Sequence, residues 1–271
     1  MAIHQTAVVD RRAEIHPEAE IGPYAIIEGD VRIGAGTRIE AHAFVGEGTT
    51  IGRGCRIHPF AVVGHAPQDL KYRGGVTYTL IGDETVIREH AQIHRGVAPG
   101  SSTIVGCRCL IMATAHVGHN SVVGDEVKMA NGALLAGHVE VGNGVFMSGN
   151  AVAHQFSRIG ELVMVGGVAR VPHDVPPFMS VVYEQIYGIN VVGMRRVGFT
   201  REERDEIKRC YRILFRSGLI FPAAIAQVVE TVQTAPGRRL AEFLQAPSRR
   251  GYMHGPRRTR RLEAPIDQEV S

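Results

Sequence analysis

The sequence contains no tryptophan, and aromatic residues make up only 6% of its 271 residues. A compact globular core usually relies on bulky rings, whereas stacked repeats rely on small and β-branched residues. Glycine is abundant by contrast, with 32 residues, and the hydrophobic fraction of 44% is sufficient for a core. The composition therefore favours a repeat architecture.

Paired cysteines and long apolar runs are also missing. The four cysteines show no CxxC spacing, which argues against a disulfide framework and a structural zinc site. No apolar run approaches the roughly 20 residues that span a bilayer, and the N-terminal segment MAIHQTAVVD lacks the pattern of a signal peptide. With a net charge of only +3, we expect a reduced, cytoplasmic protein with no cofactor, no nucleic-acid partner and no stable membrane insertion.

One aliphatic residue recurs at every sixth position. From Val9 to Val171 this register has 28 positions, and all are aliphatic except Asp69, Gly75 and Pro99. A period of six fits neither a helix nor a single strand, whose periods are 3.6 and 2. A small residue follows most of the aliphatic residues by four positions, as a crowded corner requires. The pattern predicts a β-helix over residues 1–187, with three hexads in each triangular coil and about nine coils.

Two segments interrupt the register, and the register ends before the C-terminus. Residues 64–80 and 94–104 contain glycine and proline and are predicted to leave the prism as loops, either functional or merely tolerated. Thr200 and Glu203 form a capping-box pattern for a helix that ends at Gly218, and residues 221–234 are predicted as a second helix. We therefore expect an α-helical domain over residues 188–245, followed by a basic, flexible tail over residues 246–271.

Four histidines are predicted to line one edge of the prism. His119 and His138 are 19 residues apart and His138 and His154 are 16 apart, each close to one 18-residue coil, and His116 precedes His119 by three. Exposed corner histidines without a function would be the ordinary explanation. The functional alternatives are a zinc site and a general base, because the pKa of histidine is ordinarily near neutrality. Geometry alone leaves these alternatives open.

The order of the motifs resembles one family of hexapeptide-repeat transferases. QDLKY begins at Gln68, IHRG at Ile93 and AHVGHN at Ala115, and LAGHV, HQF and GINVVGMRR follow. The series is similar to that of the UDP-N-acetylglucosamine 3-O-acyltransferases over nearly the whole chain. The resemblance implies a left-handed β-helix and a homotrimer with its clefts between subunits. It also implies transfer of a 3-hydroxyacyl group from acyl carrier protein to the 3-position of UDP-N-acetylglucosamine, the first step of lipid A biosynthesis.

The resemblance further implies roles for individual residues. His119 would be the general base, and the backbone N–H of Gly137 would stabilise the oxyanion. The loop residues would hold the sugar and the acyl hydroxyl, the histidines would line the sugar-nucleotide groove, and one glycine would set the acyl length. The residues implied in substrate binding are Gln68, Asp69, Lys71, His94, His116, His138, His154, Gln155, Gly167, Asn190 and Arg196. No metal ligand is implied.

Three positions depart from the pattern of that family. Asn120 follows the proposed base where an aspartate is frequent, Val192 stands where a glutamate can contact the nucleotide, and segment 180–188 lacks a glycine soon after the PPF turn. The histidine cluster and these departures together leave two alternatives. One is a zinc enzyme like the γ-class carbonic anhydrases, which the spacing of His116 and His119 fits less well, and the other is a catalytically altered paralogue that binds a nucleotide sugar.

Overall fold

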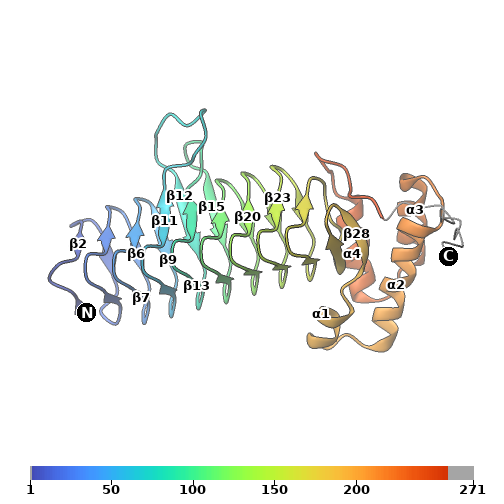
Figure 1. Ribbon diagram of the computed structural model, residues 1–271, viewed down its shortest axis with the longest axis horizontal. Coiled ribbons are helices and arrows are strands. Elements are labelled where there is room, and N and C mark those ends of the chain that lie inside the picture. The colour runs from blue at the N-terminus through green and yellow to red at the C-terminus, as the bar shows by residue number, and fades with distance from the viewer. Residues whose placement is uncertain (1, 256–271) are drawn as a thin grey trace, which may run out of the picture.

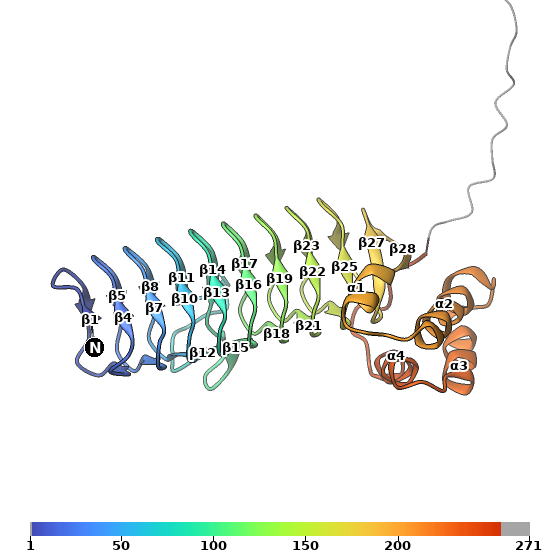
Figure 2. The same cartoon turned by 90° about the horizontal axis from the view of Figure 1, so that it is seen from below.

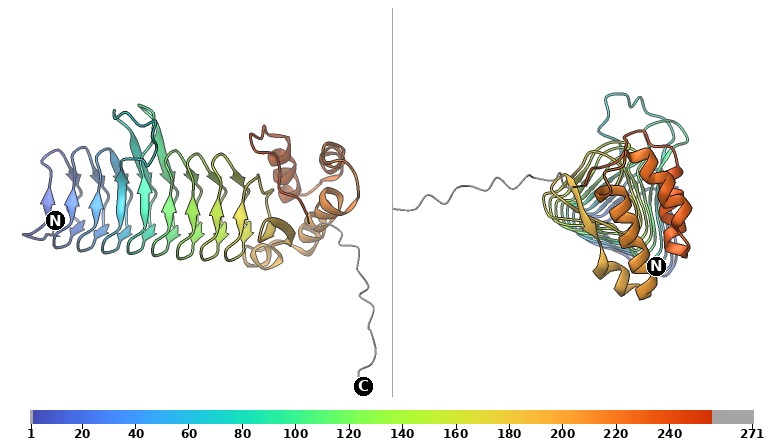
Figure 3. Two further views of the ribbon diagram at one scale, coloured as in Figure 1. Left: turned by 45° about the horizontal axis from the view of Figure 1, so that its top comes forward. Right: turned by 90° about the vertical axis from the view of Figure 1, so that its right-hand side faces the viewer.

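The computed structural model describes residues 2–255 as an elongated prism of short strands with helices at one end (Figure 1). Viewed end-on, the coils trace a triangle (Figure 3). Each coil places one short strand in each of three sheets, and almost all neighbouring strands are parallel. The chain thus forms the parallel β-helix that the six-residue period predicts.

The three sheets are nearly equal in length. The first contains β1 (Ala2–Ile3), β4 (Glu20–Ile21), β7 (Arg38–Ile39), β10 (Arg56–Ile57), β13 (Val86–Ile87), β16 (Leu110–Ile111), β19 (Lys128–Met129), β22 (Phe146–Met147), β25 (Met164–Val165), β27 (Met179–Val182) and β28 (Gln185–Ile189). The second contains β2 (Val8–Val9), β5 (Ile26–Ile27), β8 (Phe44–Val45), β11 (Val62–His65), β14 (Gln92–His94), β17 (His116–Val117), β20 (Leu134–Leu135), β23 (Val152–Ala153) and β26 (Arg170–Val171). The third contains β3 (Glu14–Ile15), β6 (Arg32–Ile33), β9 (Thr49–Ile51), β12 (Tyr78–Ile81), β15 (Ser102–Val105), β18 (Val122–Val123), β21 (Glu140–Val141) and β24 (Arg158–Ile159).

The aliphatic residue of each hexad points into the prism. Ile27, Val63 and Ile93 are fully buried, whereas the residue before each of them is exposed or half-buried. Each such side chain contributes about 1.5–3 kcal/mol when it is removed from water. The small residue four positions later is also buried. Cys55 and Cys109 occupy that position, and burial raises the pKa of the Cys109 thiol to about 11.

Every coil turns at three edges, where non-glycine residues adopt left-handed φ angles from 52° to 68°. The ring edge joins the first sheet to the second, the loop edge joins the second to the third, and the helix edge joins the third to the first. Turn residues include Tyr24, His42, Phe60 and His90 on the ring edge, Asn120, His138 and Phe156 on the loop edge, and Leu162 and Phe178 on the helix edge.

Both interruptions leave the prism at the loop edge. The first runs from β11 to β12 and stands out from the coils, and the second runs from β14 to β15 (Figure 1). The irregular segments are residues 66–77 and 95–101, shorter than the predicted 64–80 and 94–104. They are shorter because the strands extend into them, with Tyr78 of β12 opposite Ser102 of β15. The composition of the loops did not reveal this extra pairing.

Four helices follow the last coil and gather at the C-terminal end of the prism (Figure 2). They are α1 (Val191–Arg196), α2 (Arg201–Arg216), α3 (Phe221–Thr231) and α4 (Ala235–Gln245), of which α2 and α3 extend beyond β27 and β28. The capping box predicted at Thr200 and Glu203 is confirmed. The helix predicted over residues 221–234 ends three residues earlier, because Thr234 caps α4 instead. Neither α1 nor α4 was predicted as a separate helix.

The first part of the predicted tail is packed rather than flexible. The Asp174 N–H donates to Gly251 O over 2.8 Å, the Met253 N–H donates to Asp174 O over 2.9 Å, and the Ile186 N–H donates to His254 O over 2.9 Å. The buried Asp174 carboxylate also pairs with Arg158 at 2.7 Å. Residues 246–255 therefore run back along the last coils, whereas the remainder of the predicted tail, 256–271, lies outside the described residues.

Candidate active site

The predicted base His119 lies in the loop-edge turn between β17 and β18. Its side chain is almost buried, with 8% exposed. The Asn120 side-chain oxygen lies 3.0 Å from His119 Nδ1 and also accepts the Val97 N–H at 3.0 Å. Because Val97 can only donate, the amide oxygen of Asn120 faces His119, and Nδ1 must therefore carry a proton. In the neutral ring, the free lone pair then lies on Nε2.

The first loop brings a carboxylate to that free nitrogen. Asp69 Oδ2 lies 3.3 Å from His119 Nε2. The other oxygen of Asp69 accepts the Lys71 N–H at 2.8 Å, which fixes the orientation of the carboxylate. The loop is tied to the second interruption because Arg95 Nη2 donates to the Tyr72 hydroxyl over 2.9 Å. The first interruption thus contacts His119 directly at Nε2, and the second acts on Nδ1 through Asn120.

Gly137 lies against the His119 ring one coil further along. A Cβ at this position would stand 2.5 Å from both Cε1 and Nε2 of His119, closer than any side chain tolerates. The neighbouring His138 N–H donates to His119 O over 2.9 Å. Among the hydrogen bonds of residues 2–255, none uses the Gly137 N–H. The glycine therefore leaves space beside the base and a backbone donor that a ligand can use.

Three other histidines near the loop edge, His94, His116 and His138, form ring contacts and have lowered pKa values. Burial, followed by the charges of His116, His65 and His119, lowers the pKa of His94 to about 4. Burial and then the His119 charge lower the pKa of His116. Burial, His119 and then Arg249 lower that of His138. The centroid distances are 4.8 Å between His94 and His116 and 5.1 Å between His119 and His138.

Two further predicted residues continue the loop edge. His154 and Gln155 occupy the turn one coil beyond His138, and His154 Nδ1 lies 3.1 Å from the Gln155 carbonyl oxygen. Gln68 and Lys71 lie on the first loop and are exposed. The structure therefore brings the following predicted residues to one edge: Gln68, Asp69, Lys71, His94, His116, His119, Gly137, His138, His154 and Gln155.

Three predicted residues lie on other edges of the same chain. Gly167 is in the ring-edge turn between β25 and β26, where a Cβ would meet only Gly149 O at 3.7 Å. Asn190 caps α1 and donates to Leu162 O on the helix edge over 2.8 Å. Arg196 ends α1. These side chains are separated from His119 within one chain by the width of the prism.

Sequence reasoning did not single out several neighbours of the site. Tyr72 and Arg95 lie within the QDLKY and IHRG motifs but were given no role, and no motif contained Val97. Phe156 stacks on His138 with 4.9 Å between the ring centroids, and the Arg249 guanidinium lies 5.2 Å from the Phe156 ring. No signal pointed to Arg249, because it lies in a segment predicted to be flexible.

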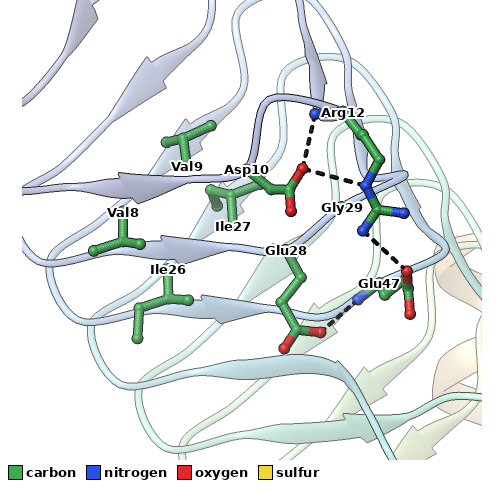
Figure 4. A pocket seen from close by; sticks show the side chains of 9 residues that line it. All are labelled: Val8, Val9, Asp10, Arg12, Ile26, Ile27, Glu28, Gly29 and Glu47. Carbon is green, nitrogen blue, oxygen red and sulfur yellow. Dashed lines mark hydrogen bonds and ion pairs between the residues drawn. The ribbon is translucent and has the colours of Figure 1, made fainter.

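The largest charged network lies away from His119, around a cavity of about 360 Å³ in the N-terminal coils (Figure 4). Arg12 contacts Asp10 and Glu47 there, and Glu28 accepts the Glu47 N–H at 2.9 Å. These groups satisfy one another, so the network is best read as structural. Within residues 2–255, no three potential ligands converge in a metal-binding arrangement, and no helix there is long and apolar enough to cross a membrane.

Comparisons with known proteins cover nearly the whole chain. Residues 174–253 match the family model described as UDP N-acetylglucosamine O-acyltransferase, domain 2, and residues 12–47 and 30–65 match the bacterial transferase hexapeptide model. The acyl-[acyl-carrier-protein]–UDP-N-acetylglucosamine O-acyltransferase of Thermodesulfovibrio yellowstonii is 43% identical over 91% of this chain and 97% of its own length. The enzyme of that name from Syntrophobacter fumaroxidans is 43% identical over 93% and 100%.

A solved structure agrees with the fold. The UDP-N-acetylglucosamine acyltransferase of Francisella novicida superposes with a TM-score of 0.92 at 35% identity, over 98% of this chain and 100% of that one. The prism is left-handed like these solved structures, a property that the period of six does not determine by itself.

Proposed function

This chain belongs to the acyl-[acyl-carrier-protein]-dependent UDP-N-acetylglucosamine O-acyltransferases, and we propose that His119 is the general base of its acyl transfer. The acceptor is the 3-hydroxyl of the sugar, and the donor is a 3-hydroxyacyl thioester of acyl carrier protein. The product is the first acylated intermediate of lipid A biosynthesis. The observation that carries the role of His119 is the Asn120 oxygen held between the Val97 N–H and His119 Nδ1.

The fixed tautomer determines what His119 can do. The sugar hydroxyl gives its proton to Nε2 as its oxygen attacks the thioester carbonyl carbon. The resulting imidazolium carries N–H groups on both sides, one facing Asn120 and the other facing Asp69 at 3.3 Å. The carboxylate of Asp69 therefore stabilises the charge that forms on the ring. When the tetrahedral intermediate collapses, the same proton goes to the departing thiolate, so no acyl-enzyme is needed.

Gly137 suits the role of oxyanion donor. Negative charge develops on the former carbonyl oxygen in the transition state, and a backbone N–H directed at it stabilises the transition state by about 2.7–4 kcal/mol. The Gly137 N–H has no acceptor among residues 2–255, and the missing side chain leaves room for the carbonyl beside the His119 ring.

The residues on the other edges suggest that the site is completed by a second subunit. Gly167, Asn190 and Arg196 lie on the ring and helix edges, away from His119. In a homotrimer whose clefts lie between subunits, the loop edge of one subunit would face these residues on its neighbour. Gly167 would then leave room for a long acyl chain, and Asn190 and Arg196 would contact the nucleotide.

Transfer of the acyl group from acyl carrier protein to UDP-N-acetylglucosamine tests the chemistry directly. The wild type is expected to form the 3-O-acyl product, and His119→Ala is expected to lose most of the activity. Absence of transfer with every acyl length from about C10 to C16 would instead favour the nucleotide-sugar-binding paralogue. Retention of most activity by His119→Ala would refute the role of the base.

Mixed trimers test the shared cleft. His119→Ala and Asn190→Ala subunits, unfolded and refolded together at equal amounts, should recover about a quarter of the wild-type rate, because about a quarter of the clefts then combine two intact halves. Each variant refolded alone is the matched control. If one chain held the whole site, every cleft would keep a defect and the mixture would be no faster than the average of its parts.

A further inference from the structure

The column of rings on the loop edge ends at Arg249, a cation of the C-terminal segment. The Arg249 guanidinium lies 5.2 Å from the centre of the Phe156 ring, and that ring stacks on His138 at 4.9 Å. His138 in turn contacts His119 edge-on at 5.1 Å. Three contacts thus connect the positive charge to His119, and the two between rings each join successive coils.

The segment that carries Arg249 is held firmly to the last coils. The Arg250 carbonyl oxygen lies 2.6 Å from His173 Nδ1, and Arg250 Nε donates to Pro172 O over 3.0 Å. The Asp174 N–H pairs with Gly251 O on the other side. Because these hydrogen bonds hold the two residues that follow Arg249, the backbone of Arg249 has a defined position at the loop edge.

The charge of Arg249 is available to a ligand. Two arginines of the last coils are paired with carboxylates, Arg158 with Asp174 at 2.7 Å and Arg170 with Glu184 at 2.9 Å, and the neighbouring Arg250 donates to the Pro172 carbonyl oxygen. No ion pair among residues 2–255 involves Arg249, and its side chain is exposed. An arginine stacked on an aromatic ring keeps its planar N–H groups free for bidentate contacts with an anion such as phosphate.

We infer that Arg249 binds the diphosphate of the nucleotide-sugar acceptor. The turns of His119, His138 and Phe156 lie on successive coils, so Phe156 is about 10 Å from the base at a strand spacing of ~4.8 Å. This inference rests on the proposed role of His119, which fixes where the sugar hydroxyl lies. It adds to that proposal a phosphate contact from the C-terminal segment.

Both substrates contain phosphate, and they differ in how far that phosphate lies from the reacting atoms. About five bonds of ~1.5 Å connect the sugar 3-oxygen to the first phosphorus of the nucleotide, so the two phosphates lie within roughly 6–9 Å of the reacting oxygen. In the pantetheine arm of the carrier, about thirteen bonds connect the thioester sulfur to phosphorus, which is roughly 16 Å when extended. The contacts from His119 through His138 and Phe156 to Arg249, at 5.1, 4.9 and 5.2 Å, place the guanidinium no more than about 15 Å from the His119 ring. Because an N–H···O contact with phosphate spans about 3 Å of that distance, the guanidinium can reach the diphosphate, whereas the extended carrier arm would place its phosphate beyond it.

Arg249→Gln tests the inference, with Arg249→Lys as the charge-retaining variant and Arg11→Gln, an exposed arginine in the first coils of the same edge, as the matched control. Arg249→Gln should raise the KM for UDP-N-acetylglucosamine about tenfold, as loss of a charge-assisted phosphate contact does. The kcat and the KM for acyl carrier protein should stay within about twofold. Arg249→Lys should be intermediate, and Arg11→Gln should match the wild type.

Measuring the binding of UDP and uridine tests the inference independently of the proposed reaction. UDP should bind Arg249→Gln about tenfold more weakly than the wild type, whereas uridine, which lacks phosphate, should bind both equally. Equal UDP affinity in the two proteins overturns the inference even where transfer is normal. An increase confined to the KM for acyl carrier protein also overturns it and assigns Arg249 to the carrier surface. UDP binding without any transfer in the wild type refutes the proposed reaction and leaves the binding comparison decisive.

Discussion

Two edges of the prism carry histidines and phenylalanines on the same turns, yet they differ in chemistry. On the ring edge, Tyr24, His42, Phe60 and His90 stack in a column, with centroid distances of 4.9–5.3 Å and nearly parallel planes. On the loop edge, His138 and Phe156 stack in the same way at 4.9 Å. The turn residues of both columns have φ angles near 60°. The repeat therefore supplies stacked rings at either edge without distinguishing them.

The difference comes from what covers the edge. His42 is exposed, with one ring above it and one below. His119, one residue before a turn position, is covered by Asp69 of the first interruption and oriented through Asn120 by Val97 of the second. On this scaffold, the histidine that we propose as the base is thus the one over which the interruptions of the coil fold back.

The largest contrast is expected from removing one histidine on each edge. His119→Ala should lower the rate of acyl transfer by about 10²–10⁴-fold, the usual contribution of a positioned base. His42→Ala should stay within about twofold of the wild type, since it removes only an exposed stacking contact. The kcat of each purified variant, with circular dichroism to verify the fold, provides the comparison. Comparable losses in both variants would show that the ring edge at His42, far from Gly167, also takes part in the reaction.

A methyl group added beside the base should have the next largest effect. Gly137→Ala places Cβ 2.5 Å from His119 Nε2 and Cε1, so the ring must move. A displacement of about 1 Å can cost about a hundredfold in rate. Gly149 holds the same turn position on the ring edge, where the nearest atom would be 3.5 Å from the new Cβ. Gly149→Ala should therefore lower kcat much less than Gly137→Ala does, although Gly149 adjoins Gly167 of the proposed acyl pocket, and an equal loss would contradict the steric argument.

Acid should destabilise the loop edge through His94. Its pKa is about 4 in the folded state against an ordinary 6.5, so between these values the unfolded chain takes up a proton that the folded chain does not. Stability is therefore lost as the pH falls from about 6.5 to 4, by on the order of 3 kcal/mol for this group. Urea unfolding between pH 7 and pH 4.5 should show a shallower pH dependence for His94→Gln. The ring-edge control His42→Gln should keep the wild-type slope.

The smallest effect is expected from changing the charge on the partner of His119. Asn120→Asp keeps an oxygen acceptor for both Val97 and His119 but adds a negative charge beside Nδ1. An adjacent carboxylate favours the imidazolium, so the acid limb of the pH–rate profile should move to higher pH. The rate above that limb should rise by a few-fold. Asn150→Asp, at the equivalent turn position of the ring edge, should leave the profile unchanged.

The prism could be predicted from the sequence because the residues that determine each coil are close together in the chain. One aliphatic residue every sixth position and a small residue four places later determine which side chains enter the core, and residues such as Ile27 and Val63 are fully buried in the structure. The capping box at Thr200 was equally readable, because both halves of the motif lie within four residues. A pattern that repeats along the chain, or that lies within one turn, can be interpreted without knowing how distant segments fold.

The candidate site was harder to predict because its contacts join segments that are distant in the sequence. Asp69 and His119 are fifty residues apart in the chain but 3.3 Å apart in space, and only a family resemblance linked their motifs. The packing of residues 246–255 depends on Asp174, which is buried by a segment far from it in sequence. An arginine-rich tail therefore looked flexible although Arg249 lies against Phe156.

The fixed length of a coil also bears on the order in which the chain folds. In uninterrupted coils a strand pairs with one 18 residues away, as Ala2 does with Glu20, so this parallel sheet is assembled from contacts close in sequence. The two interruptions lengthen that span to 30 residues between Arg56 and Val86 and to 24 between Val86 and Leu110. The longer closure adds up to about 0.5 kcal/mol of chain entropy. Coil-by-coil assembly should therefore be slowest at the coils that carry the two loops.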